Sequence, residues 1–177
     1  MRRSLLSHLG KNASSFQEAM KEKVVSPEGV SQLSDRLRAE GKTVATLNGS
    51  FDLLHPGHFE MIYQASQVAD CLILLLNTDR SIQAYKSEDR PINPLEVRLQ
   101  QVAALEMVDY VSWFDETDPR EVLGRICPDV HVNGGDYGED CLEAEVVRAG
   151  GGKIHIVELV PGYSSTNMIN KIQALCV

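Results

Sequence analysis

The sequence lacks any apolar run long enough to cross a bilayer. A membrane-spanning helix needs roughly 20 consecutive apolar residues, and no stretch of this chain approaches that length. Arg2 and Arg3 precede two leucines, but polar residues follow at once, so the hydrophobic region of a signal peptide is missing. We therefore expect a cytoplasmic protein without membrane association.

The sequence also has few cysteines and no excess of basic residues. The cysteines lie at positions 71, 127, 141 and 176, and no two have CxxC spacing, so we interpret them as reduced thiols. The formal net charge is −8 at pH 7. General nucleic-acid binding requires a basic surface and is therefore not expected. An anionic small substrate remains compatible, because a few local cations can hold a phosphate inside an acidic protein.

The chain has 177 residues and 43% apolar content, which is typical of one compact domain. Residues 1–22 are polar and weakly patterned, and we interpret them as an N-terminal extension. Residues 23–177 form the expected domain. Apolar patterns predict strands near 43–47, 71–76, 109–113, 130–132 and 153–157. Predicted helices run from 26–27 to 38–39, over 57–68, from 93–94, from 118–119 and over 164–175.

Strands therefore alternate with helices along the chain. This order predicts an α/β fold, a Rossmann-like parallel sheet of about five strands with helices on both faces. Ligands of such sheets bind beyond the carboxyl ends of the strands. We therefore expect the loops after the first, second and fourth strands to meet at one site.

Residues 48–58, NGSFDLLHPGH, join the first predicted strand to a helix. Gly49 permits close approach of the backbone to a ligand. His55 and His58 are three positions apart, so they share a face of a helical turn whose free N–H groups favour anions. Two surface histidines or a zinc pair are the alternatives, but no third ligand has zinc spacing and we predict no metal site built by the protein. The preceding strand and glycine turn favour a phosphate site.

Three cations follow the second predicted strand. Lys86, Arg90 and Arg98 suit phosphate binding, because a guanidinium fits phosphate geometry and an ammonium is a mobile point charge. The alternative is that Lys86 and Arg90 balance the acidic residues between them on a solvated loop, with Arg98 an exposed helical charge.

Two further segments follow predicted strands. The glycines at 134 and 135 let the backbone approach a base or ribose, and Asp136 suits a hydroxyl or a cation, although a plain turn uses the same residues. Ser165 and Thr166 begin the last helix, where hydroxyls and free N–H groups bind phosphates or simply cap the helix.

Residues 48–58 closely resemble the GxFDxLHxGH signature of small cytidylyl- and adenylyltransferases, within the nucleotidyltransferases that carry HxGH. The likeness to bacterial heptose-1-phosphate adenylyltransferases runs from near Lys23 to about Ile172. It includes residues 86–98, 114–119, 134–137 and 164–167. This chain departs from that family at Asn133, where members usually carry Lys.

The resemblance implies transfer of AMP from ATP to the sugar 1-phosphate D-glycero-D-manno-heptose 1-phosphate. We expect Mg²⁺ as cofactor, because it bridges triphosphate oxygens, and a homodimer, which is common for compact enzymes of this kind. The resemblance assigns catalysis to His55, His58, Lys86 and Arg98, and the acceptor phosphate to Lys86, Arg90 and Arg98. The expected nucleotide-binding residues are Asn48, Gly49, Phe51, Asp52, Gly134, Gly135, Asp136, Ser165 and Thr166. The alternatives are a CTP-dependent enzyme acting on glycerol or ethanolamine phosphate, and a nucleotide-binding module without catalysis.

Overall fold

Five parallel strands form the centre of the structure, a computed structural model that describes residues 15–135, 138, 140–158 and 160–175. The sheet has the order β3-β2-β1-β4-β5, and each neighbouring pair is parallel. The strands are β1 (Val44–Gly49), β2 (Cys71–Asn77), β3 (Tyr110–Phe114), β4 (Val130–Gly134) and β5 (Lys153–Val157). The α/β fold with a five-stranded parallel sheet is therefore confirmed.

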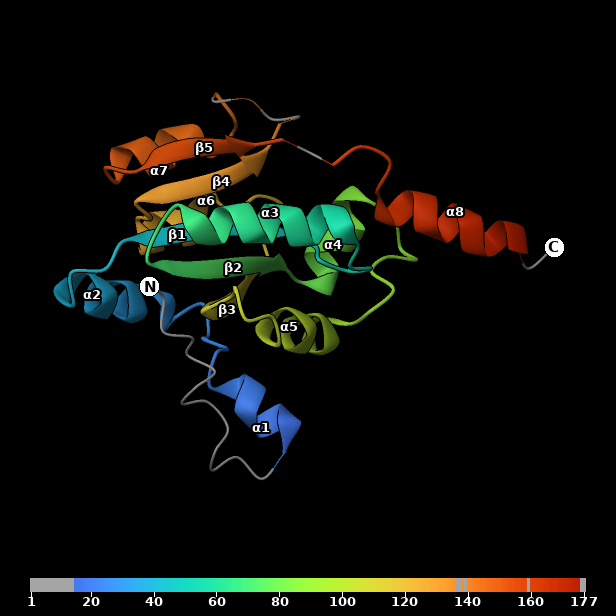
Figure 1. The fold of residues 1–177 in the computed structure, drawn as a ribbon, viewed down its shortest axis with the longest axis horizontal. Coiled ribbons are helices and arrows are strands. Elements are labelled where there is room, and N and C mark those ends of the chain that lie inside the picture. Colours follow the sequence, from blue (N-terminus) through green and yellow to red (C-terminus); the bar gives the residue numbers. More distant parts are fainter. Residues whose placement is uncertain (1–14, 136–137, 139, 159, 176–177) are drawn as a thin grey trace.

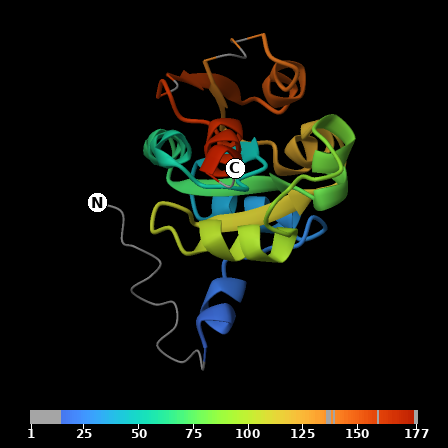
Figure 2. The same cartoon turned by 90° about the vertical axis from the view of Figure 1, so that its right-hand side faces the viewer.

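Helices cover both faces of this sheet (Figure 1). They are α1 (Phe16–Lys21), α2 (Val30–Ala39), α3 (Pro56–Gln67), α4 (Asp79–Tyr85), α5 (Leu95–Ala103), α6 (Arg120–Ile126), α7 (Ala144–Ala149) and α8 (Ser165–Leu175). Helices α3 and α5 pack in one apolar cluster, whereas α2, α6 and α7 pack in the other. Figure 2 looks onto the carboxyl ends of the strands, where α8 stands in front of the sheet.

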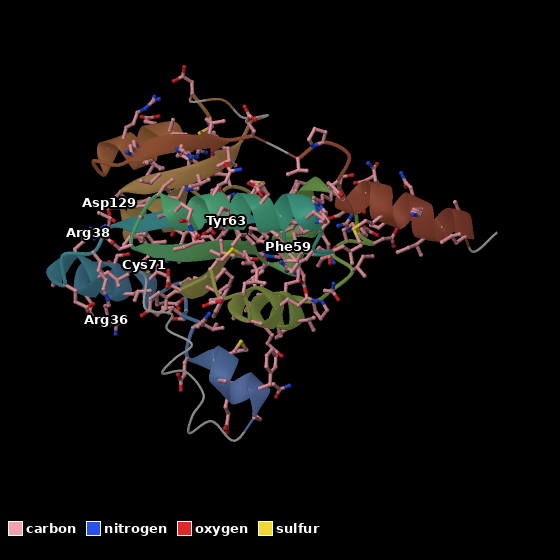
Figure 3. The ribbon with its side chains drawn as sticks, viewed as in Figure 1. Arg36, Arg38, Phe59, Tyr63, Cys71 and Asp129 are labelled. Atoms are coloured by element: carbon pink, nitrogen blue, oxygen red, sulfur yellow. The ribbon has the colours of Figure 1, made fainter. Side chains whose placement is uncertain are left out.

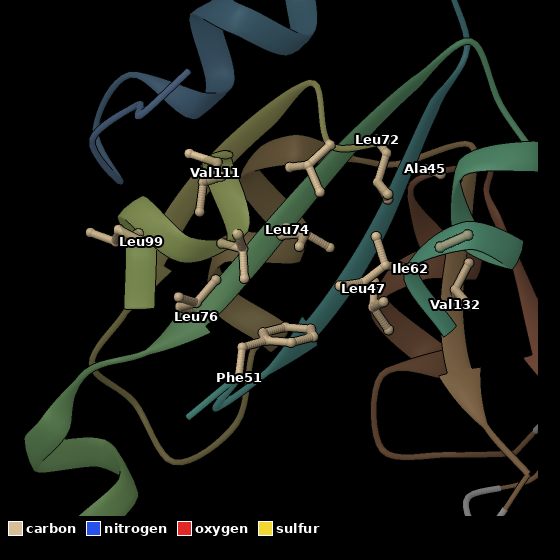
Figure 4. Packing of buried hydrophobic residues seen from close by; sticks show 14 of the residues in the cluster. Ala45, Leu47, Phe51, Ile62, Leu72, Leu74, Leu76, Leu99, Val111 and Val132 are labelled. Atoms are coloured by element: carbon tan, nitrogen blue, oxygen red, sulfur yellow. The ribbon is translucent and has the colours of Figure 1, made fainter. Parts of the chain in front are cut away.

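Strand β2 shows how the sequence divides the core into two layers. Successive side chains of a strand point to opposite faces, and every residue of β2 is buried. Leu72, Leu74 and Leu76 pack toward Ile62 of α3 and Leu99 of α5 (Figure 4). Burying each such leucine contributes about 1.5–3 kcal/mol, which explains why an unbroken apolar run forms the centre of a parallel sheet.

The other face of β2 carries Cys71, Ile73 and Leu75. These side chains pack with Leu33 of α2 and Leu123 of α6. All five are no more than 5% exposed. The two layers therefore fix the direction of β2 and place its carboxyl end beside that of β1.

Helices α2 and α4 differ from the sequence-based expectation. Ser26 and Pro27 precede a turn rather than a first helical turn, and α2 begins at Val30 after Gly29. Helix α4 was not predicted at all. It begins after Thr78, whose hydroxyl accepts a hydrogen bond from the Ser81 backbone N–H. A seven-residue helix with a single cap gives too short an apolar pattern to recognise.

Part of the segment expected to be an extension packs on the domain. Met20 of α1 is 6% exposed and belongs to the cluster beneath α5. The Lys23 ammonium donates to the carbonyls of Leu105 and Val108, at 3.1 and 2.7 Å. Burial lowers the pKa of Lys23, against the raising effect of nearby carboxylates. Met20 and Lys23 therefore anchor this segment to the domain.

The amino ends of the strands are held by polar contacts far from α8 (Figure 3). Asp129 accepts a 2.7 Å hydrogen bond from the Val44 N–H, and Arg38 donates to the carbonyls of Ile126 and Cys127. The end of the sheet with Arg38 and Asp129 is thus closed by structural contacts. No helix in the described part of the chain has the length and apolarity that crossing a membrane requires.

Candidate active site

A cavity of about 720 Å³ opens at the carboxyl ends of the strands. Loops after β1, β2, β3 and β4 all contribute to its wall, together with the start of α8. The meeting of the loops after strands one, two and four is as expected from the fold. Its lining residues include these members of the predicted site: Asn48, Gly49, Phe51, His55, His58, Lys86, Gly134, Ser165 and Thr166.

The two histidines lie against each other at the start of α3. Their ring centroids are 3.9 Å apart with an interplanar angle of 31°. His55 precedes the helix in extended conformation, and its carbonyl accepts from the His58 N–H at 2.9 Å. A side chain at position 57 would meet the His55 ring at 3.1 Å. Gly57 therefore makes the room that this ring arrangement needs.

Both imidazoles favour the neutral form. Burial and the neighbouring charges of His55 and Lys86 lower the pKa of His58 from 6.5 to about 4, and burial lowers the pKa of His55. The Nδ1 atoms of both rings are buried without a hydrogen-bond partner among the described residues. Because an imidazolium carries N–H on both nitrogens, this arrangement suits neutral rings that each have one donor.

Gly49 and Phe51 shape the floor of the cavity. Phe51 is 2% exposed and adopts a positive φ of 45°. Its ring lies 5.6 Å from the His58 ring, centroid to centroid. A Cβ at position 49 would lie 3.2 Å from the Phe51 ring. The absence of a side chain at Gly49 therefore leaves room for the Phe51 ring and keeps the end of β1 accessible from the cavity.

Lys86 lines the same cavity as the two histidines. Its ammonium donates to the Ser50 hydroxyl at 3.2 Å. Removal from water lowers the pKa of Lys86, and the charges of Arg90 and Arg98 lower it further against Asp52. Because nearby cations disfavour the charged form of Lys86, an anionic ligand beside it stabilises that form.

Arg98 does not line the cavity, contrary to its predicted catalytic and phosphate-binding role. Its side chain is fully buried. Its nitrogens donate to the carbonyl of Asn93 at 3.0 Å, the carbonyl of Ser50 at 2.7 Å and the carboxylate of Asp79 at 2.6 Å. Because these contacts use Nε and both terminal nitrogens, Arg98 joins three segments around the site instead of facing it.

Asp52 and Arg90 are also not among the residues that line the cavity. Asp52 Oδ2 accepts from Arg90 Nε and Nη2 at 3.1 and 2.8 Å and from the Ile92 N–H at 2.8 Å. Its Oδ1 accepts from the Asn93 N–H at 2.8 Å. Burial raises the pKa of Asp52, but these backbone and guanidinium donors outweigh it, so the pKa is lowered. Both residues position the loop that follows Lys86.

The remaining predicted residues divide between the cavity and its surroundings. Gly134 lines the cavity, Gly135 is exposed beyond it, and Asp136 lies outside the described residues. The Ser165 hydroxyl donates to the Leu53 carbonyl at 3.3 Å, while Thr166 is exposed at the cavity. Ser164, not Ser165, caps α8 by accepting from the Asn167 N–H at 3.0 Å.

Sequence reasoning missed several lining residues. They are Ser50, Met61, Asn77, Tyr85, Thr117, Asp118, Pro119, Leu142, Glu143, Tyr163 and Ser164, besides Asn133, which was singled out only as a departure. Tyr163 faces His55 with ring centroids 6.4 Å apart. Its position just before the serines of α8 was the available signal. Leu142 and Glu143 lie in no motif, so only the fold brings them to the cavity.

The described residues include no group of three or more His, Cys, Asp and Glu side chains arranged to hold a metal ion. Asp52, the carboxylate within the segment 48–58, already accepts four hydrogen bonds. It therefore does not fit the role of a metal ligand in this arrangement.

Comparison with known proteins agrees with this geometry. Residues 46–171 match the family model described as cytidylyltransferase-like. The bifunctional protein HldE of Marinomonas sp. (strain MWYL1) is 40% identical over 149 residues, which cover 84% of this chain and 31% of that protein. HldE of Klebsiella pneumoniae subsp. pneumoniae is 41% identical over 151 residues, or 85% of this chain and 32% of that protein.

A solved structure shows the same fold. The lipopolysaccharide core biosynthesis protein from Thermoplasma volcanium GSS1 superimposes with a TM-score of 0.54 at 25% identity, covering 68% of this chain and 98% of that one. This chain spans about a third of the length of the HldE proteins. The match over residues 46–171 includes the histidine turn, the glycine pair and most of α8, and the chain belongs to the cytidylyltransferase-like family.

Proposed function

We propose that this chain transfers the adenylyl group of ATP to D-glycero-D-manno-heptose 1-phosphate, giving ADP-heptose and pyrophosphate. The observation that carries the proposal is the pair of neutral histidines, with ring centroids 3.9 Å apart, that lines one cavity together with Lys86. Neutral rings donate a hydrogen bond to phosphate oxygens without needing a counter-ion. The heptose assignment is supported by about 40% identity to HldE proteins over most of the chain.

The reaction requires no nucleophile from the protein. A phosphate oxygen of the sugar 1-phosphate attacks the α-phosphorus of ATP, and the bond from that phosphorus to the bridging oxygen of the β-phosphate breaks. The electron pair leaves with pyrophosphate. His55 and His58 stabilise the charge on the α-phosphate and the leaving group, and Lys86 neutralises the triphosphate. Thr166 and the free N–H groups of α8 bind the outer phosphates.

Mg²⁺ fits this site as an ion that arrives with the nucleotide. It prefers triphosphate oxygens and water and is rarely caged by protein alone. When bound, it neutralises charge on the triphosphate. The protein contributes the cavity and the fixed donors around it. We place the reaction in the cytoplasm, where ATP is supplied, and a homodimer stays a prediction.

The test is a substrate matrix with purified protein. ATP or CTP is combined with heptose 1-phosphate, glycerol phosphate or ethanolamine phosphate, and pyrophosphate release is measured. We expect turnover with ATP and heptose 1-phosphate. Turnover only with CTP would assign the chain to the cytidylyltransferase alternative, and tight ATP binding without turnover would assign it to a binding module.

A variant ties this activity to the histidines. His58→Ala should lower kcat by about 10²–10³-fold, because removing one preorganised donor at a developing charge has that effect. Tyr63→Phe is the matched control, since Tyr63 lies on the exposed side of the same helix, α3 (Figure 3). Full turnover by His58→Ala would overturn the mechanism.

A further inference from the structure

One wall of the cavity carries an acidic side chain that the proposed phosphate chemistry does not use. Glu143, just before α7, is 6% exposed and lines the cavity. Asn133, at the end of β4, is also 6% exposed and lines it. The Asn133 amide donates to Glu143 Oε2 across 3.4 Å. The two residues form a buried polar pair that joins β4 to the segment before α7.

This pair lacks a direct cationic partner. No ion pair within the described part of the chain includes Glu143. Arg120, whose charge interacts with Glu143 at longer range, is bound by Asp118 at 2.8 Å. A carboxylate accepts about four hydrogen bonds. Among the described residues, Glu143 accepts from two neutral donors, the Asn133 amide across 3.4 Å and the Cys141 thiol, which leaves part of that capacity unused. A buried carboxylate in this condition is costly unless a ligand donates to it.

The chemistry of this wall excludes phosphate as that ligand. His55, His58 and Lys86 come from α3 and the end of α4, whereas Asn133 and Glu143 come from β4 and α7. A carboxylate repels a phosphate and favours groups that carry hydrogen-bond donors. The described lining of the Asn133–Glu143 wall therefore suits the uncharged, donor-bearing part of a ligand whose phosphates lie at the histidines.

We propose that Glu143 and Asn133 form a subsite that binds neighbouring hydroxyls of a sugar ring and selects the substrate through them. Glu143 accepts from the two hydroxyls, and the Asn133 amide offers both a donor and an acceptor to the same ring. The ring belongs either to the ribose of the nucleotide or to the acceptor sugar. This inference rests on the proposed function, because it divides the same cavity between phosphates and hydroxyls.

The first experiment measures the protein as it is. Calorimetric titration compares ATP with 2′-deoxy-ATP and 3′-deoxy-ATP, inorganic tripolyphosphate serves as the probe of the phosphate wall alone, and heptose 1-phosphate is compared with inorganic phosphate. If the ribose is bound, ATP should bind about tenfold more tightly than at least one deoxy analogue, as expected for hydrogen bonds to a charged group. If the subsite binds the acceptor sugar, heptose 1-phosphate should bind about tenfold more tightly than inorganic phosphate.

The second experiment removes the charge. Glu143→Gln keeps the shape of the side chain. We expect it to reduce the tenfold difference in affinity seen in the first experiment to about twofold. Tripolyphosphate should bind to the variant as tightly as to the wild type, or more tightly. Glu145→Gln is the matched control, because Glu145 is an exposed carboxylate in the first turn of the same helix. Thermal unfolding checks each variant. If Glu143→Gln does not fold, Asn133→Ser tests the pair from the other side with the same titrations.

The outcomes separate this inference from the proposed function. Unchanged hydroxyl selection in a folded Glu143→Gln protein would overturn the subsite while leaving nucleotide transfer intact. A change confined to ATP against inosine triphosphate would also overturn it, because the group bound would then be the amine of the base. If wild-type protein binds neither ATP nor tripolyphosphate, both the proposed function and the subsite fail.

Discussion

Arg98 and Asp79 form an ion pair with 2.6 Å between Nη2 and Oδ1, in which the arginine side chain is fully buried and the aspartate is 38% exposed. The same guanidinium also binds the carbonyls of Asn93 and Ser50. One side chain therefore joins the loop after β1, the first turn of α4 and the loop before α5. The loop after β1 and the end of α4 line the cavity, and the loop before α5 packs against the loop after β1.

Replacing Arg98 should affect stability more than chemistry. Arg98→Lys keeps the charge but cannot make all three contacts, and we expect the free energy of unfolding to fall by about 2–4 kcal/mol. Urea denaturation measures this. Arg125→Lys, which alters a surface pair with Glu121, should change stability by no more than about 1 kcal/mol. An Arg98→Lys protein as stable as wild type but unable to bind ATP would restore the direct phosphate role.

Asp52→Asn should remove an acid-dependent stabilisation. The native pKa of Asp52 lies below its ordinary value of 3.8, so its contribution is complete above that value and is lost as pH falls through the native pKa. At pH 7 the variant should unfold at lower temperature, and the difference should shrink on acidification. Asp35→Asn, at an exposed helical pair, is the control. An equal difference at all pH values would contradict this origin.

His58 should make the ligand-free protein less stable in mild acid. Its native pKa is about 4 and its ordinary value 6.5, so the unfolded chain takes up a proton first as pH falls. Stability should decrease from pH 6.5 toward pH 4. His131, whose native pKa burial lowers to about 4, and His55, whose native pKa burial also lowers, contribute to the same decrease.

The variant that isolates this effect is His58→Asn. We expect it to reduce the slope of unfolding free energy against pH by about one proton per molecule in that range. The control is His155→Asn on β5, at a histidine that does not line the cavity. A slope that His58→Asn leaves unchanged would show that His58 titrates normally.

Lys86→Gln should weaken binding of the triphosphate as such. We expect about tenfold weaker binding of both ATP and tripolyphosphate, because a cation held near Arg90 and Arg98 gains strongly from an anionic ligand. The salt dependence of binding should fall as well, since one charge contact is lost. Lys153→Gln, at an exposed position of β5, controls for net charge. If ATP binding is lost while tripolyphosphate binding is unchanged, Lys86 contacts the nucleoside part of ATP and not its phosphates.

The sequence predicted all five strands, and it predicted β2 most clearly, because burial on both faces leaves an unbroken apolar run. It predicted the histidine turn because the chemistry is local: His55, Gly57 and His58 act within one helical turn. Helix boundaries were less certain, since α2 begins at a glycine and α4 has only seven residues.

The role of Arg98 could not be predicted, because its three partners are 5, 19 and 48 positions away. A charged residue on an amphipathic helix has the same local pattern whether it faces water, substrate or buried carbonyls. Glu143 was missed for the related reason that no motif surrounds it. In both cases the contact depends on where the sheet places other segments.

The pairing of β1 with β4 has a consequence for the newly made chain. Val44 and Asp129, which join at the start of these strands, are 85 positions apart, and Gly134 and Thr166 of the cavity come later still. A fragment on the ribosome that ends after β3 therefore lacks about half of the residues that line the cavity. Under the proposed function, ATP stabilises only a chain that has emerged as far as α8, so the earlier segments fold without help from the substrate.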